Sequence, residues 1–191
     1  MGLGGAPDEW ADYEWFRLED VPAPEVVRVG PDPASDALRL LVRDYPVWAQ
    51  QGAQRVLLVD LDNLRASPSR LRARLAVVVE LARQADHVAL AGQVGAVARS
   101  RPWLEEFADR AKAVPQGADV ADYALLAAAA KVADPVEFLV VSNDGIFAEL
   151  AERGDLTILS PGMDALSAGL HGAASMLVDL AALEAEAARS R

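Results

Sequence analysis

The sequence predicts a three-layer α/β/α fold with a mostly parallel central sheet. From Arg55 onward, short aliphatic runs alternate with longer helical segments, which is the pattern of strands joined by crossover helices. The run "RVLLVDL" is apolar on both of its faces, as expected for a strand that helices cover on both sides. The chain of 191 residues suits one such domain with a modest extension.

The first 50 residues differ from the rest of the chain. They are acidic, contain many prolines and hold three of the four tryptophans, Trp10, Trp15 and Trp48. Such large apolar side chains are unusual in a disordered tail. We therefore expect an N-terminal arm (residues 1–50) that packs either on the domain (residues 51–191) or on a protein partner. A short helix is expected over 35–43, with Ser35 as its N-cap.

The first half of the domain is predicted to hold three strands and two helices. The strand 55–61 leads to a helix over 67–85, which begins with Ser67 as a cap and Pro68 in the first turn. The next segments are a strand at 87–92, a helix at 101–112 and a short edge strand at 112–116.

The second half continues the alternation. Its segments are a helix at 118–134, a strand at 137–142, a helix at 144–153, a strand at 156–160 and a long terminal helix that ends with residues 175–190. Residues 160–183 are apolar over a wide face, which indicates either burial in the core of the domain or a homodimer interface.

Composition excludes several classes of site. The chain has no cysteine, so disulfides, thiolate zinc sites and a cysteine nucleophile are ruled out. Its net charge of -11 argues against a protein that coats nucleic acid in general. The sequence shows neither a signal peptide nor an uncharged run of about 18 residues, so we expect a cytoplasmic protein without a membrane segment.

Acidic and polar side chains follow two of the predicted strands. Asp60 and Asp62 end the first strand, and a second group comes at the end of the strand 137–142. That second group is Ser142, Asn143 and Asp144. Asp119 and Asp122 lie at the start of a helix that enters from the same edge of the sheet, three residues apart on one face. We expect these carboxylates to meet in one cleft.

Clustered carboxylates repel one another and stay ionised only when a cation lies among them. Oxygen ligands of this kind favour Mg²⁺ or Mn²⁺, which can activate water against a phosphodiester. Each residue also has a structural interpretation. Asp119, Asn143 or Asp144 could cap a helix, and Asp62 with Asn63 could form an Asx turn.

Three stretches, "VLLVDLDN", "GADVADYALL" and "LVVSNDGIFAEL", resemble in that order the motif blocks of the PIN-like superfamily, in particular its NYN branch. The resemblance covers about residues 55–159. It implies a PIN-like fold and a metal-dependent ribonuclease that acts on RNA. It further implies acidic metal ligands at Asp60, Asp122 and Asp144, with Asp119 as a competitor to Asp122.

Other positions complete the expected site. Asn63 and Ser142 match residues that orient the ligand or substrate, with Asn143 beside them, and Asp62 is a supporting acid. Ile146 is the one clear departure, because many members carry a second acid there. A catalytically degenerate interaction module, using the N-terminal arm and the acidic surface to bind a protein, is therefore an alternative.

Basic residues give the expected RNA contacts. Between Arg65 and Lys112, nine basic residues stand against five acidic ones, opposite in sign to the whole chain. Most of them fit the solvated face of an amphipathic helix. Arg65, and either Arg99 or Arg101, lie near predicted strand ends and are the better candidates for phosphate contact.

A phosphatase of the haloacid dehalogenase type is the rival enzyme. "VDLDN" resembles the opening motif of that family, with Asp60 as nucleophile and Asp62 as acid and base. That chemistry also needs a Ser or Thr after the second strand, where this chain has Gly92 and Gln93, and a suitably placed Lys, which Lys131 is not.

Overall fold

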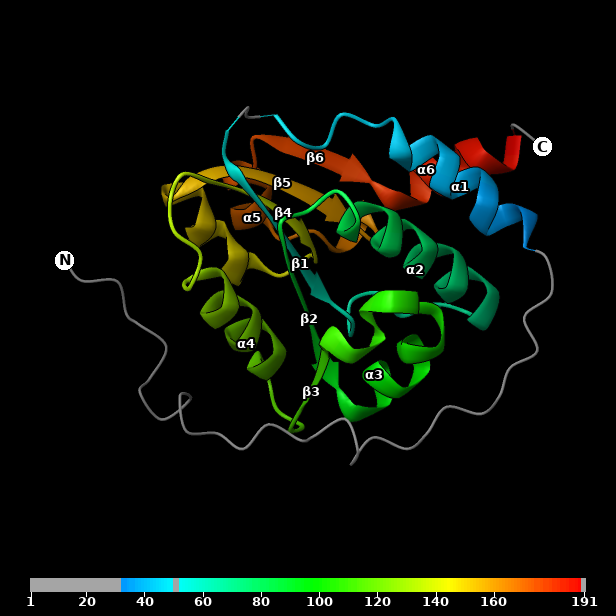
Figure 1. Cartoon of the computed structure of the whole chain (residues 1–191), viewed down its shortest axis with the longest axis horizontal. Helices are drawn as coiled ribbons and strands as arrows, with labels where there is room; N and C mark the ends of the chain where they lie inside the picture. The colour runs from blue at the N-terminus through cyan, green and yellow to red at the C-terminus, as the bar shows by residue number, and fades with distance from the viewer. Residues whose placement is uncertain (1–31, 50–51, 190–191) are drawn as a thin grey trace.

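The computed structural model describes residues 32–49 and 52–189. Its centre is a six-stranded sheet in the order β3-β2-β1-β4-β5-β6, and all neighbouring strands are parallel (Figure 1). The strands are β1 (Gln54–Asp60), β2 (His87–Gln93), β3 (Ala111–Val114), β4 (Val136–Val141), β5 (Gly154–Ser160) and β6 (Met176–Asp179). The predicted α/β class with a parallel central sheet is confirmed.

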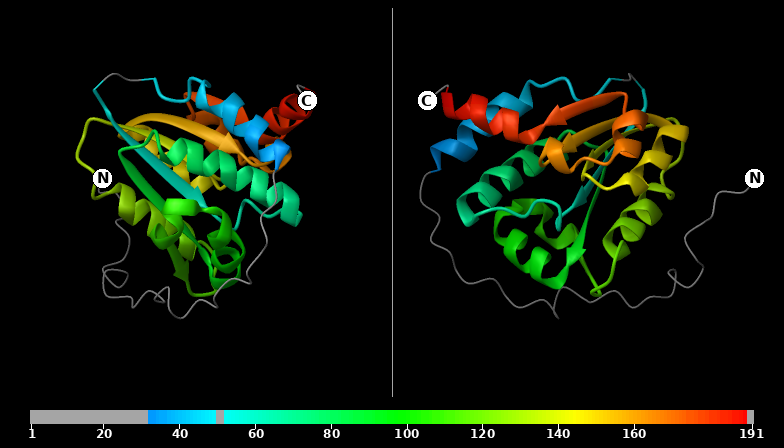
Figure 2. Two further views of the ribbon diagram at one scale, coloured as in Figure 1. Left: turned by 45° about the vertical axis from the view of Figure 1, so that its right-hand side comes forward. Right: turned by 180° about the vertical axis from the view of Figure 1, so that it is seen from behind.

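Helices cover both faces of the sheet (Figure 2). One face carries α1 (Pro33–Arg43), α2 (Pro68–Ala82), α3 (Val94–Ser100) and α6 (Leu180–Arg189). The other carries α4 (Val120–Ala129), the 3₁₀ helix η5 (Gly145–Glu152) and α5 (Ala168–Ala173). Right-handed crossovers dictate this division, because the chain moves outward from β1 in one direction and later returns to build the other half.

The change of direction lies between β1 and β4, at the middle of the sheet. In open α/β sheets, a crevice forms outside the carboxyl ends of the strands at such a switch point. Val59 of β1 pairs with Val141 of β4, so Asp60 and Ser142 are the next residues along the two strands. These two polar residues therefore lie side by side at the crevice.

Side-chain alternation sets the face on which Asp60 and Ser142 lie. In β1, Val56 and Leu58 belong to the apolar cluster beneath α4, whereas Leu57 and Val59 belong to the cluster beneath α2. Successive side chains of a strand point to opposite faces, so Asp60 shares the α4 face with Leu58. By the same rule Ser142 follows Val140 onto that face.

The N-cap of the first helix differs from the prediction. Asp32 caps α1 by accepting hydrogen bonds from the N–H groups of Ala34 and Ser35, and Pro33 occupies the first turn. Ser35 lies inside the helix, where its hydroxyl donates to Asp32 Oδ2 over 2.6 Å. The proline fixes the start of the helix, because it suits a position where no N–H is needed.

Only part of the N-terminal arm falls within the described residues. Trp48 packs against the main apolar cluster of the domain. The expectations for Trp10 and Trp15 concern residues outside the described ranges.

Two predicted helices are wrong in part. Residues 101–112, expected to form one helix, form two 3₁₀ segments, Arg101–Trp103 and Glu105–Arg110, and the start of β3, and the α-helix α3 ends before them at Ser100. The first of these segments contains Pro102. Proline lacks an amide donor and does not suit a helix interior.

The terminal segment is likewise not one long helix. Its first residues form β6, which pairs with β5, and α6 begins only at Leu180. The apolar face that suggested a homodimer is covered within the chain, since Val178, Leu180 and Leu183 are core residues.

Within the described part of the chain, no helix combines the length and the apolar character that crossing a bilayer requires.

An ion-pair network ties α6 to α2. The guanidinium of Arg74, 4% exposed, donates to Glu184 Oε1 over 2.8 Å and to the carbonyl oxygen of Pro161 over 2.8 Å. Arg70 donates to the other oxygen of Glu184 over 2.7 Å. Burial alone would raise the pKa of Glu184, but the hydrogen bonds from the two arginines outweigh it and lower that pKa.

Replacing Glu184 by Ala is expected to lower the free energy of unfolding by roughly 2–4 kcal/mol, because it leaves the Arg74 charge buried and unpaired. Urea unfolding measures the change. Asp109→Ala is the matched control, since the carboxylate of Asp109 is 86% exposed and its pair with Arg101 should contribute about 0.5 kcal/mol or less. Equal losses in the two variants would contradict a structural role for the Glu184 network.

Candidate metal centre

Three carboxylates meet at the carboxyl edge of the sheet. One oxygen each from Asp119, Asp122 and Asp144 lies within 4.8 Å of the others. Asp119 and Asp122 come from the start of α4, and Asp144 comes from the segment that follows β4. We call this group the acidic triad. Two elements that are far apart in the sequence build it, as expected from the switch point.

Asp119 does not use its side chain as a helix cap. It occupies the N-cap position of α4 with a left-handed backbone, φ 60°, and its carboxylate makes no capping hydrogen bond. A residue with a side chain rarely adopts that conformation unless the surrounding structure holds it there. Asp119 thus holds the expected N-cap position without the expected side-chain hydrogen bond, and its exposed carboxylate is available to a ligand.

Asp122 carries an unpaired polar atom. The residue is 6% exposed, and its Oδ1 has no hydrogen-bond partner among the described residues. Leaving a buried carboxylate oxygen unpaired costs free energy, and native proteins seldom tolerate it without a ligand or water. The carboxylate of Asp122 belongs to the acidic triad, where a cation would satisfy it.

Asp144 combines two roles. Its Oδ1 accepts the N–H of Ile146 over 3.1 Å and so caps η5, while its own N–H donates to the hydroxyl oxygen of Ser142 over 3.2 Å. Capping therefore fixes the position of this carboxylate without removing it from the triad. Ile146, where a second acid was expected from the resemblance, is partly buried against the apolar cluster beneath α4.

Asp60 lies beside the triad without belonging to it. Its Oδ1 accepts the N–H of Asp62 over 2.9 Å, and its Oδ2 accepts hydrogen bonds from the side chains of Asn63 and Ser142. Ser142 thus connects Asp60 to Asp144. The structure gives Asp60 the position of a support for the ligands rather than that of an exposed ligand.

Asp62 joins the ends of two strands. Its Oδ2 accepts the N–H of Gln93 over 2.8 Å. The approach requires glycine at position 92, since a Cβ there would come within 2.9 Å of Leu61 Cβ and 3.4 Å of Asp62 Oδ2. The sequence interpretation gave Gly92 and Gln93 no positive role and counted them only against a phosphatase. A glycine at the end of a predicted strand was the available signal.

Asn143 holds three segments together. Its side-chain oxygen accepts the Ser160 hydroxyl over 2.6 Å, its side-chain nitrogen donates to the carbonyl of Gly162 over 3.0 Å, and its carbonyl accepts the N–H of Ser167 over 3.1 Å. Because both ends of the amide are engaged, Asn143 positions the adjacent Asp144. The sequence predicted substrate contact here and did not reveal this bracing.

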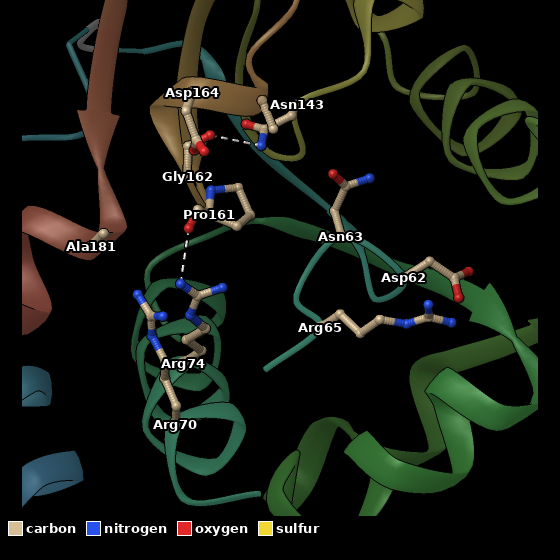
Figure 3. A pocket seen from close by; sticks show the side chains of 11 residues that line it. Asp62, Asn63, Arg65, Arg70, Arg74, Asn143, Pro161, Gly162, Asp164 and Ala181 are labelled. Carbon is tan, nitrogen blue, oxygen red and sulfur yellow. Dashed lines mark hydrogen bonds between the residues drawn. The ribbon is translucent and has the colours of Figure 1, made fainter. Parts of the chain in front are cut away.

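The two predicted basic residues differ in position. Arg65 is exposed and lines a pocket of about 500 Å³ together with Asp62, Asn63 and Asn143 (Figure 3). Arg99 lies on α3, is exposed and is not among the residues that line this pocket.

The pKa of Asp122 is raised to about 7, from an ordinary value of 3.8. Burial is the largest cause, and the neighbouring carboxylates add to it, with Asp60 first, then Asp144 and Asp119, and Asp62 last. Burial also raises the pKa of Asp60, against the lowering effect of its hydrogen bonds from Asn63 and Asp62. The site is thus short of positive charge near neutral pH.

The acidic triad fits a small divalent cation. Oxygens on opposite sides of a Mg²⁺ ion are about 4.2 Å apart, so carboxylates within 4.8 Å of one another need only small side-chain shifts to bind it. An all-oxygen ligand set suits Mg²⁺ or Mn²⁺, and the chain offers no thiolate. The unpaired Asp122 oxygen is the observation that favours a cation over helix capping alone.

Comparisons with known proteins give no relative. No protein-family model matches the sequence, and a search of curated proteins finds no match.

The metal-free protein should lose stability as the pH rises from about 4 to 7. Because the pKa of Asp122 is raised in the folded protein, its contribution to the free energy of unfolding is fully present below pH 3.8, the ordinary pKa of the unfolded chain. That contribution is lost as the pH passes 7. Between pH 5.5 and 8, wild type in EDTA should lose roughly 2 kcal/mol more than Asp122→Asn, as measured by urea unfolding. If the free energies of unfolding of wild type and Asp122→Asn changed in parallel with pH, the pKa of Asp122 would not be raised in the folded protein.

Removal of a triad carboxylate should weaken Mn²⁺ binding. Calorimetric titration is expected to show at least a tenfold loss in Asp122→Asn and in Asp144→Asn, and a smaller loss in Asp62→Asn. Asn at position 62 can still accept the Gln93 N–H, so it tests charge alone. Equal losses in all three variants would contradict the assignment of the ligands to the triad.

Proposed function

We propose that this protein is a divalent-metal-dependent ribonuclease of the PIN-like type, which cleaves RNA phosphodiester bonds at the acidic triad. The observation that carries the proposal is the buried, unpaired Asp122 oxygen among three carboxylates at the switch point of the sheet. Such a site calls for a cation, and oxygen-bound Mg²⁺ or Mn²⁺ is the usual partner of phosphate chemistry.

The arrangement of the three sequence blocks supports the PIN-like assignment. Asp60 ends β1, Asp122 lies in the first turn of α4, and Ser142 with Asp144 follows β4. All lie at one edge of the sheet, and the charge of Asp60 acts on Asp122. The nearness of Asp60 to residues 62 to 84 positions later in the chain supports the family resemblance.

The triad carboxylates would hold the cation, which when bound supplies charge stabilisation to the phosphate under attack. Ser142 accepts a hydrogen bond from the backbone N–H of Asp144 and donates one to Asp60, so these two residues help to position Asp144. Asp119 supplies the third carboxylate that Ile146 does not. The departure at position 146 therefore does not leave the site short of acids.

The phosphatase interpretation has less support. A nucleophilic aspartate needs a free oxygen directed at the substrate, whereas Asp60 is 4% exposed and both of its oxygens accept hydrogen bonds. Asp62, its expected acid and base, is engaged by the Gln93 N–H. An interaction module without activity is distinguished from the nuclease by the assay below.

Wild-type protein should cleave an RNA that contains single- and double-stranded segments in Mn²⁺ or Mg²⁺ and should be inactive in EDTA. Asp122→Asn and Asp144→Asn should each lose at least about 100-fold in rate, since they remove a proposed metal ligand. Asn at position 144 can still cap η5, which separates the metal role from the capping role.

Asp109→Asn is the matched control and should retain wild-type activity, because it removes an exposed carboxylate on another part of the surface. Folded wild type that binds Mn²⁺ and cleaves nothing would overturn the nuclease and leave a binding protein. Activity that survives in Asp122→Asn would assign the chemistry to other residues.

A further inference from the structure

We propose that the pocket beside the acidic triad is a nucleotide subsite, in which Arg65 contacts the phosphate of the nucleotide adjacent to the cleaved bond. This inference rests on the proposed ribonuclease function. The pocket lies between α2 and the segment after β5 (Figure 3). The helix α4 lies on the other face of the sheet.

No triad residue lines the pocket, but two of its lining residues connect it to the residues around the triad. Asn143, which lines it, precedes the triad residue Asp144 in the chain. Asn63, which also lines it, donates to Asp60. A strand of RNA with one phosphate at the triad would therefore place a neighbouring nucleotide in this pocket.

The shape of the pocket suits part of a polymer. Its volume of about 500 Å³ lies within the range of small-ligand sites, roughly 300–1,000 Å³, and it opens broadly to solvent. An open pocket lets a chain enter and leave. A free metabolite is usually more fully enclosed.

Among the described residues that line this pocket, Arg65 is the arginine whose side chain has no ion-pair partner. It lies in the loop between β1 and α2, so it is not part of the solvated face of a helix. It forms no ion pair with any residue in the described ranges. An exposed guanidinium without a carboxylate partner is suited to a phosphate group.

The other two arginines of the pocket already bind groups within the protein. Arg70 and Arg74 share Glu184, and Arg74 also donates to the Pro161 carbonyl. Two guanidinium groups against one carboxylate still leave one positive charge on that wall. The carboxylates of Asp62 and Asp164 also line the pocket, so its positive charge is confined to Arg65 and to the wall formed by Arg70 and Arg74.

The remaining polar groups can contact a sugar and a base. Asp62, Asn63 and Asp164 line the pocket and offer carboxylate and amide groups, which hydrogen-bond ribose hydroxyls and base edges. Carboxylates repel a phosphate, so the phosphate belongs near Arg65.

The test compares Arg65→Ala with wild type on two substrates in Mn²⁺. A ribohexanucleotide fills the triad and the pocket, whereas bis(4-nitrophenyl) phosphate is a diester without a neighbouring nucleotide. The loss in kcat/KM should be at least about ten times greater on the hexanucleotide, mainly through KM. Arg43→Ala, an exposed arginine on α1 outside the pocket, should behave as wild type on both substrates.

Equal losses on the two substrates, or no loss on either, would overturn the subsite. Binding of the same hexanucleotide in EDTA, followed by fluorescence anisotropy, separates this result from failure of the nuclease itself. The plot of log affinity against log salt should be shallower by about 0.7 in Arg65→Ala. If neither substrate is cleaved but that difference persists, the subsite stands without the nuclease. Unchanged binding would refute it.

Discussion

The electrostatic conflict at the carboxyl edge of the sheet is the constraint on which the rest of the site depends. One oxygen of Asp122 lacks a partner among the described residues, and burial together with the neighbouring carboxylates raises the pKa of this residue to about 7. A fold does not gain stability from such an arrangement. Strain of this kind is characteristic of functional sites, where a ligand relieves it.

The scaffold holds the carboxylates together against their repulsion. Parallel pairing brings Asp60 and Ser142 side by side, and alternation along the strands turns both toward α4. Ser142 then contacts the Asp144 backbone, while Asn143 locks the loop in which Asp144 lies. The loop after β4 thus positions Asp144 through neutral side chains, whereas the start of α4 positions Asp119 and Asp122.

The sequence predicted the sheet well, because buried parallel strands leave an uninterrupted apolar signal. It also placed Asp60 and Asp144 at one edge, because parallel strands end at the same edge, and Asp122 near them, because its helix was expected to begin at that edge. It did not predict β6, whose four residues are too few to distinguish from the helix that follows. It could not rank Asp119 against Asp60 as a ligand, because the left-handed turn at Asp119 and the hydrogen bonds that occupy Asp60 arise from tertiary contacts.

The central claim is that Asp119, Asp122 and Asp144 hold a divalent cation. Diffraction from crystals grown with MnCl₂, recorded on both sides of the manganese absorption edge, tests it most directly. If these three residues hold the cation, we expect one anomalous peak among their carboxylates, with Asp122 Oδ1 in contact with it. Its absence in well-ordered crystals at neutral pH, or a peak bound by Asp60 and Asp62 instead, would contradict the account.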